Sequence, residues 1–156
     1  MQHLNIRWNP HTFKILGILF TNDLETCIEL NFREKIKEMK KLFSVWLKRQ
    51  ITPLGRLAIL KSLILSKLIY LWILLPNPPD NVTQEIQNLV FDFIWNKKRD
   101  RISRRFSSKN IEDGGIGIPN IKNYINSLKL SWFKDKFNKS QMEKCMYHLL
   151  SKDKPY

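Results

Sequence analysis

The sequence has 156 residues, and its 27 Lys and Arg against 14 Asp and Glu give a formal net charge of +13 at pH 7. A hydrophobic content of 43% with 12% aromatic residues excludes a disordered tail, and five Gly and seven Pro exclude collagen-like and low-complexity chains. The basic excess predicts a polyanionic partner, either nucleic acid or an anionic membrane surface. Two Cys cannot form a disulfide framework, so we expect a reducing, intracellular environment, the cytoplasm or the nucleus.

The N-terminal residues predict a short β-hairpin. Apolar and polar residues alternate over 4–8, a turn is marked at 9–11, and 13–20 is rich in residues that favour strands. Gly17 interrupts the second of these runs, which predicts a bulge or the close approach of another backbone.

Two long helices are predicted next, over 24–49 and 53–75. In the first, apolar residues recur at intervals of three and four and form one face, opposite a row of lysines. Thr52 is a suitable N-cap and Pro53 a suitable first residue for the second helix, which a proline-rich stretch ends. We expect the two helices to pack antiparallel, with the lysines of 33–48 outside. The residues expected inside this pair are Trp46, Leu60, Leu63, Ile64 and Leu68.

The second of these helices is apolar enough to raise the question of a membrane span. Lys61 and Lys67 interrupt it, and only 68–75 is an uninterrupted apolar run. That run is far shorter than the roughly 20 residues that a spanning helix needs. We therefore expect a helix that is central to the core of the protein.

A third helix is predicted over 82–95, followed by a segment, 97–109, with seven basic residues and one acid. The glycines of 112–119 predict a tight turn, which is followed by a helix at 121–137 and a weaker one at 141–150. The predicted fold class is therefore mainly α: a helical bundle with a short N-terminal β-hairpin and a basic loop. By composition, the chain divides into three segments. The hairpin lies in 1–23, the helical bundle in 24–95, and the basic loop, the glycine turn and the C-terminal helices lie in 96–156.

The sequence predicts no catalytic, metal or cofactor site. Its acids are scattered and form no D-x-D, D-D or E-x-x-H arrangement, so ordinary surface ion pairs explain them. Cys145 and His148 are three residues apart, but no second pair has the spacing of a structural zinc site. The glycines at 114, 115 and 117 have neither the G-x-G-x-x-G spacing nor the Gly-Lys-Ser/Thr ending of a phosphate loop.

The basic segment is the strongest functional signal. A run of like charges repels itself unless anions screen it, and arginine forks match phosphate oxygens. Trp95 before the run and Phe106 within it either stack on bases or dock the loop on the protein. Contact with phosphates, without reading of bases, is the physical expectation.

Six short motifs, in this order and spacing, resemble the reverse transcriptases of non-LTR (LINE-type) retrotransposons, in the stretch after the catalytic palm. Together they cover about 13–137. The hairpin and helix motifs are matched by Lys14-Ile15-Leu16-Gly17-Ile18; by Trp46, Arg49, Ile51-Thr52, Gly55-Arg56 and Lys61; and by Lys67, Tyr70 and Pro76. The later motifs are matched by Phe93-Ile94-Trp95-Asn96-Lys97-Lys98; by Gly114, Gly115, Gly117 and Pro119; and by Ser127-Leu128-Lys129 and Trp132.

This resemblance implies the thumb and connector of an RNA-directed DNA polymerase, with the segment 14–18 as its primer-grip hairpin. The family's metal-binding aspartates lie upstream, in the palm, so Mg²⁺ is implied only for an intact polymerase and no cofactor is expected in this chain. The implied partners are an RNA or DNA template–primer duplex and the palm domain, with no membrane. The expected nucleic-acid-binding residues are Lys14, Gly17, Arg49, Arg56, Lys61, Lys97, Lys98, Arg99, Arg101, Arg104 and Arg105.

Two other classes of function stay open at this stage. A structural or protein-interaction domain would carry its basic surface incidentally, and a peripheral membrane protein would use the apolar helix 53–75. Clustering of the exposed Lys and Arg side chains on one face favours nucleic acid over the first alternative.

Overall fold

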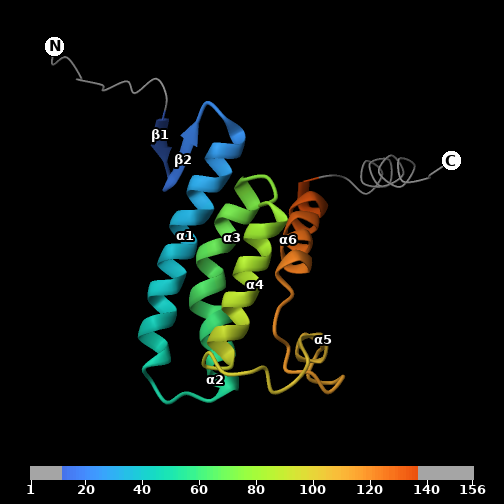
Figure 1. Cartoon of the computed structure of the whole chain (residues 1–156). Coiled ribbons are helices and arrows are strands. Elements are labelled where there is room, and N and C mark those ends of the chain that lie inside the picture. The colour runs from blue at the N-terminus through green and yellow to red at the C-terminus, as the bar shows by residue number, and fades with distance from the viewer. Residues whose placement is uncertain (1–11, 137–156) are drawn as a thin grey trace, which may run out of the picture.

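A computed structural model describes residues 12–136, which form a helical bundle preceded by a two-stranded hairpin (Figure 1). The predicted fold class is confirmed. The elements are β1 (Thr12–Ile15), β2 (Ile18–Thr21), α1 (Leu24–Leu47), α2 (Pro53–Ile59), the π-helical turn η1 (Leu60–Ile64), α3 (Leu65–Leu74), α4 (Asp80–Ile94), α5 (Arg104–Ser107) and α6 (Ile121–Lys136). The predicted strand at 4–8, the predicted helix at 141–150 and the pair Cys145 and His148 lie outside the described residues.

The run 13–20, predicted as a single strand after a turn at 9–11, is divided into two strands, so the hairpin of the described residues lies within this run and its flanks. The predicted turn at 9–11 lies outside the described residues. Strands β1 and β2 pair antiparallel with Ile15 opposite Ile18, so Leu16 and Gly17 form a two-residue turn. Both have positive φ, 49° and 84°, as a type I′ turn requires. The predicted bulge at Gly17 is therefore wrong, and so is the alternative of a close backbone approach, because no atom lies within 4 Å of an added Cβ. Glycine serves here as a turn residue, because a left-handed backbone costs it little.

A buried amide attaches the hairpin to α1. The Asn31 side chain accepts a hydrogen bond from Leu19 N at 2.9 Å and donates to Leu19 O and Cys27 O, both at 2.7 Å. It is only 2% exposed. Asp23 caps the start of α1 by accepting from Thr26 N, and hydrogen bonding by the side chain and backbone of Thr26 holds the pKa of the Asp23 carboxyl below its usual value.

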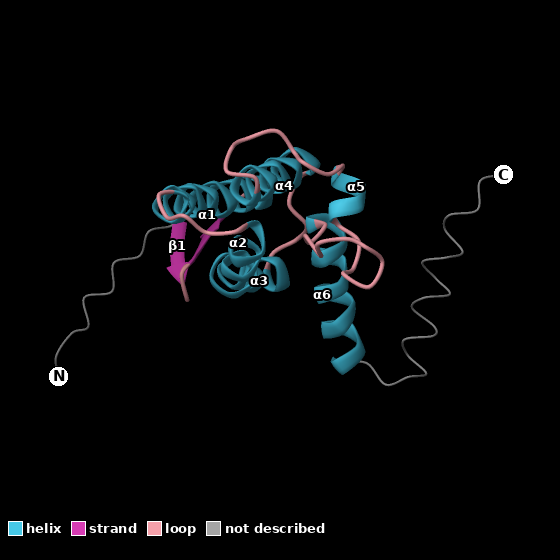
Figure 2. Cartoon of the chain, turned by 90° about the horizontal axis from the view of Figure 1, so that it is seen from below, coloured by secondary structure: helices cyan, strands magenta, loops and turns pink. Residues whose placement is uncertain are grey.

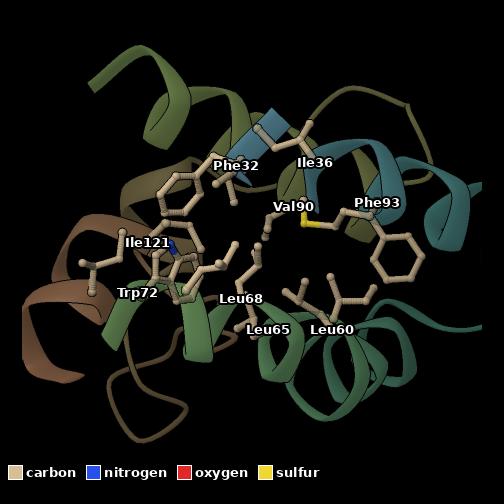
Figure 3. Packing of buried hydrophobic residues seen from close by; sticks show 14 of the residues in the cluster. Phe32, Ile36, Leu60, Leu65, Leu68, Trp72, Val90, Phe93 and Ile121 are labelled. Carbon is tan, nitrogen blue, oxygen red and sulfur yellow. The ribbon is translucent and has the colours of Figure 1, made fainter. Parts of the chain in front are cut away.

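Four helices surround the core. α1 contacts α3 and α4, and α6 contacts the same two helices from the other side (Figure 2). The centre is filled by large apolar side chains from all four, among them Phe32, Trp72, Phe93 and Ile121 (Figure 3). Ile18 of β2 and Ile125 of α6 belong to the same buried cluster. The three composition segments of the sequence therefore share one hydrophobic core.

The expected antiparallel pairing of α1 with the chain from Pro53 to Leu74 is present, but two of its expected inner residues are not buried. Leu60, Ile64 and Leu68 are at most 1% exposed, whereas Leu63 is 44% exposed and Trp46 is only partly buried at the edge of the core. Leu60, Ile64 and Leu68 follow one another at intervals of four and define the inward face of the helix. Leu63 directly precedes Ile64, so the helix turns its side chain about 100° away from that face.

Within the described residues, one helix, Pro53–Leu74, is long and apolar enough to cross a membrane by length and composition alone, with a mean hydropathy of 1.9. Its inner face, which includes Leu57, Leu71 and Trp72, is buried against the other helices. A core helix of a soluble bundle passes the same test.

The predicted glycine turn is confirmed, and it folds the chain back over α5. Ile118 N donates to Ser107 O at 3.0 Å and Gly117 N donates to Lys109 O at 2.9 Å. A Cβ at Gly115 would lie 2.1 Å from Lys109 O, a distance that real atoms do not adopt. Gly115 is therefore required by close backbone approach.

Replacing Asn31 with Ala should detach the hairpin. Three polar partners lose their bonds, two of them on the backbone of β2, so the free energy of unfolding should fall by about 1–3 kcal/mol in a urea titration. Hydrogen exchange at Leu19 should accelerate more than at Leu68 in the core. Asn126→Ala, at an exposed position of α6, is the matched control and should be close to neutral. Equal effects of the two variants would contradict this role for Asn31.

A comparison of Gly115→Ala with Gly114→Ala distinguishes a glycine required by close backbone approach from a glycine required by a positive φ. Gly114 has φ 77° and no atom within 4 Å of an added Cβ, so its substitution should cost only about 1–2 kcal/mol of left-handed strain. Gly115→Ala should lower the free energy of unfolding by more, because the Lys109 backbone has to move. Thermal unfolding of both variants measures which substitution lowers the stability more. A smaller loss of stability in Gly115→Ala would contradict the role of Gly115 in close backbone approach.

Candidate nucleic-acid interface

Much of the predicted basic site lies at one end of the bundle. There α1 ends, α2 begins and α4 ends, so the segment 48–53 and the loop after α4 run close together (Figure 1). A single cavity lined by Ile51 and Pro53 on one side and by Asn96 and Arg101 on the other places the two junctions in contact. Arg49 and the basic loop at 97–101 therefore occupy the same end of the molecule.

Lys14 and Gly17 are not part of that end. Their hairpin is bonded to Asn31 in the first half of α1, and the Tyr70 hydroxyl of α3 donates to Leu16 O in the turn. From Asn31 to the end of α1 at Leu47 the helix rises by about 24 Å. The structure therefore separates the predicted primer-grip residues from the basic end.

Lys61 occupies a third place, beside the glycine turn. Its side chain is exposed on η1, and a Cβ at Gly117 would lie 3.6 Å from Lys61 Nζ. The expected site residues are thus brought together in part, with Lys61 and the hairpin residues apart from the others.

Arg56 is buried, although the sequence resemblance places it among the residues expected to contact nucleic acid. The side chain is 6% exposed, and Nη1 donates to Phe93 O at 3.2 Å and to Ile94 O at 3.4 Å. These carbonyls form the last turn of α4, where the helix dipole is negative and a cation is stabilising. Arg56 therefore joins α2 to α4. Its spacing of four from Leu60 places it on the inward face of the helix, a signal that the charge of the residue obscured.

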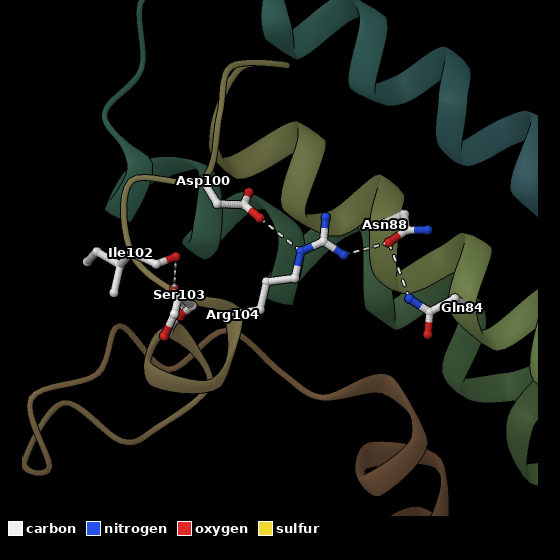
Figure 4. A network of polar contacts seen from close by, with 7 residues as sticks. Gln84, Asn88, Asp100, Ile102, Ser103 and Arg104 are labelled. Atoms are coloured by element: carbon white, nitrogen blue, oxygen red, sulfur yellow. Dashed lines mark hydrogen bonds and ion pairs between the residues drawn. The ribbon is translucent and has the colours of Figure 1, made fainter.

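Arg104 is also engaged inside the protein, although it is exposed. Nε donates to Asp100 at 2.9 Å, Nη1 donates to Asn88 Oδ1 at 2.6 Å, and the guanidinium lies 4.6 Å from the centre of the Phe91 ring (Figure 4). Asn88 and Phe91 belong to α4. Arg104 thus fixes the basic loop on α4.

The remaining cations of the loop are exposed and have no acidic partner among the described residues. The ion pairs within residues 12–134 join Arg33 to Glu29, Lys35 to Glu38, Lys40 to Glu85, Arg104 to Asp100 and Lys122 to Asp80. The loop cations outside these pairs are Lys109 and five residues of the predicted site, Lys97, Lys98, Arg99, Arg101 and Arg105. Arg49, across the junction, is exposed and lies 4.7 Å above the Trp46 ring. On the basic face of α1, by contrast, Arg33, Lys35 and Lys40 have acidic partners, so that face is partly neutralised.

The two aromatic residues of the loop have different roles. Trp95 is 6% exposed and belongs to the core, so it docks the loop. Phe106 is 52% exposed, with Lys109 Nζ 4.6 Å from the ring centre, so it lies outside the core.

Among the described residues, no group of three or more His, Cys, Asp and Glu side chains is placed to hold a metal ion. A scan against models of known protein families finds no match to this chain.

Arg56→Ala should destabilise the bundle whatever the ligand. It leaves the carbonyls of Phe93 and Ile94 without their charged donor, so the free energy of unfolding should fall by about 1.5–3 kcal/mol in urea. Arg49→Ala, which also removes one charge at this end, should change it by no more than about 0.5 kcal/mol. Similar losses in both variants would show that Arg56 does not hold α4.

Proposed function

We propose that this chain binds nucleic-acid duplex by its phosphate backbone, as the thumb-like part of a reverse transcriptase of the non-LTR retrotransposon type. The observation that carries the proposal is the group of exposed cations without acidic partners at the end of α4, which together with Arg49 forms the basic end of the bundle. From here on, "basic end" means Arg49, Lys97, Lys98, Arg99, Arg101 and Arg105.

The basic loop is held in place on α4, and this supports a nucleic-acid-binding function over a basic surface that is incidental. Unpaired like charges repel one another, and a free loop would spread them apart. Here Arg104 and the buried Trp95 hold the loop against α4, so the cations stay close together. Holding them in place in advance lowers the entropy cost of binding a polyanion.

The chemistry of the basic end favours phosphates over bases. Guanidinium and ammonium groups are donors only, and they match the acceptor oxygens that every nucleotide presents. Contacts of this kind set affinity and position, and they carry no sequence information. We therefore expect weak discrimination between sequences.

The part of the proposal that names a reverse transcriptase rests on the resemblance of the sequence motifs. Several of its motif residues have positions that few other residues satisfy: Thr52 caps α2, Arg56 caps α4, and Gly115 permits close backbone approach. Requirements of this kind are the physical basis of a motif. Under the same proposal the exposed apolar side chains of the hairpin, Phe13 and Leu16, face the palm domain of the intact polymerase.

The proposal for this stretch is binding without polymerisation. The resemblance places the metal-binding aspartates in the palm, and Mg²⁺ belongs to the intact polymerase. A primer-extension assay tests this point, because metal-dependent addition of nucleotides by the chain alone would overturn it.

A salt titration of duplex binding tests the basic end. A triple variant with Lys98→Gln, Arg99→Gln and Arg101→Gln should weaken binding to all sequences alike. It should also flatten the log–log salt dependence by up to about 2.7, since each neutralised phosphate contributes about −0.9. Fluorescence anisotropy with two unrelated duplexes at several salt concentrations measures both effects.

The matched control removes the same charge from the body of the bundle. Lys37→Gln, Lys41→Gln and Lys67→Gln change exposed side chains of α1 and α3 and should leave the slope nearly unchanged. If both triple variants weaken binding equally, net charge alone explains it and the basic surface is incidental. If neither does, the proposed interface is wrong.

A further inference from the structure

The basic loop and the short helix α5 contain three serines, and their surroundings differ. Ser107 is fully buried, and its hydroxyl donates to Ser103 O at 3.1 Å and to Ile102 O at 3.4 Å. Ser108 is partly buried. Ser103 is exposed on the turn before α5, and its hydroxyl forms no hydrogen bond among the described residues (Figure 4). Ser103 is therefore the serine of this segment whose Oγ is open to solvent.

This difference in burial reverses the order that the sequence alone suggests. Protein kinases that act on basic segments bind arginines near the target serine with acidic groups of their own, since opposite charges steer and fix a complex. Arg104 and Arg105 stand three and two residues before Ser107, which makes Ser107 the better target by sequence. Its burial removes it as a target in the folded chain, and Ser103 is left.

The chain before Ser103 is accessible and basic. Residues 99–103 belong to no helix or strand, and their N–H groups take part in no backbone hydrogen bond of the described residues. Arg99 and Arg101, four and two residues before Ser103, are exposed. The ion pair from Asp100 to Arg104 spans Ser103, but both side chains are partly exposed, and a pair of this kind is weak. An enzyme can therefore bind this segment without unfolding the bundle.

We propose that Ser103 is a phosphorylation site that regulates duplex binding by the basic end. The inference rests on the proposed function and deepens it. A protein kinase transfers the γ-phosphoryl group of a nucleoside triphosphate to Ser103 Oγ, the hydroxyl proton passes to a base of the kinase, and the nucleoside diphosphate is released. The product carries a charge of about −1.5 to −2 at pH 7 and three acceptor oxygens.

A phosphate on Ser103 competes with nucleic acid for the same arginines. Arg101 and Arg105 are each two residues away, and neither takes part in an ion pair of the described residues. Guanidinium groups form charge-assisted hydrogen bonds with either kind of phosphate. The phosphate on Ser103 is attached to the same segment, so its effective concentration is far higher than that of a duplex in solution. Phosphorylation should therefore weaken duplex binding.

The site is tested on the folded chain with a protein kinase that selects serines preceded by arginine, supplied with ATP and Mg²⁺. Mass spectrometry of the digested product should locate phosphate on Ser103, and Ser103→Ala should remove that signal. Absence of phosphate at Ser103, or its restriction to Ser107 and Ser108, would overturn the inference.

Duplex binding by the chain phosphorylated at Ser103 tests the regulation. Fluorescence anisotropy at about 0.1 M salt should show binding weakened roughly tenfold or more. The log–log salt dependence should flatten by up to about 1.8, because the new charge offsets about two phosphate contacts of about −0.9 each.

A pair of variants separates the position of the new charge from its sign. Ser103→Glu adds one negative charge to the basic loop, and Ser131→Glu adds the same charge at an exposed position of α6. Ser103→Glu should weaken duplex binding more than Ser131→Glu. Equal weakening by the two variants would overturn the inference, because net charge alone would then explain it.

The unmodified chain distinguishes failure of this inference from failure of the proposed function. If the unmodified chain binds duplex and phosphate on Ser103 leaves the affinity unchanged, the regulation is wrong and the proposed function stands. If the unmodified chain does not bind duplex at all, the proposed function fails, and the inference fails with it.

Discussion

The contact between Arg56 and the last turn of α4 is the constraint on which the functional end of the molecule depends. It joins two segments that are 37 and 38 residues apart in the sequence, and it does so with a charged side chain at the negative end of a helix. Because α4 ends there, the basic loop begins there. Arg56 also lines a cavity at this end, together with Trp95, Lys98 and Arg101.

The distribution of ion pairs distinguishes the basic loop from the basic face of α1. Arg33, Lys35 and Lys40 of the α1 face have acidic partners, so that face is partly neutral and is well explained as a solvated surface. The loop after α4 has one internal pair, and that pair involves Arg104, whose second donor group reaches Asn88. Within the described residues, the loop after α4 is thus a segment in which most cations have no acidic partner.

The hairpin and the basic end are separate in space. The hairpin is bonded to Asn31 in the first half of α1 and the basic end lies beyond Leu47, so a single duplex would have to extend about 24 Å, or about seven base pairs, to reach both. The hairpin turn is instead held by Tyr70, and its apolar residues are exposed.

The sequence by itself determined the helical class, the ends of the helices near Asp23, Thr52 and the proline-rich stretch, and the glycine turn. These are local properties, set by periodicity, capping and backbone conformation within a few residues. Only the tertiary structure decided that Leu63 points outward, that Arg56 and Trp95 are buried, and that Arg104 is bonded to α4. A charged residue in a sequence looks the same whether it meets water or a helix end 37 residues away. Its role is fixed by a partner that only the packing of α2 on α4 brings within reach.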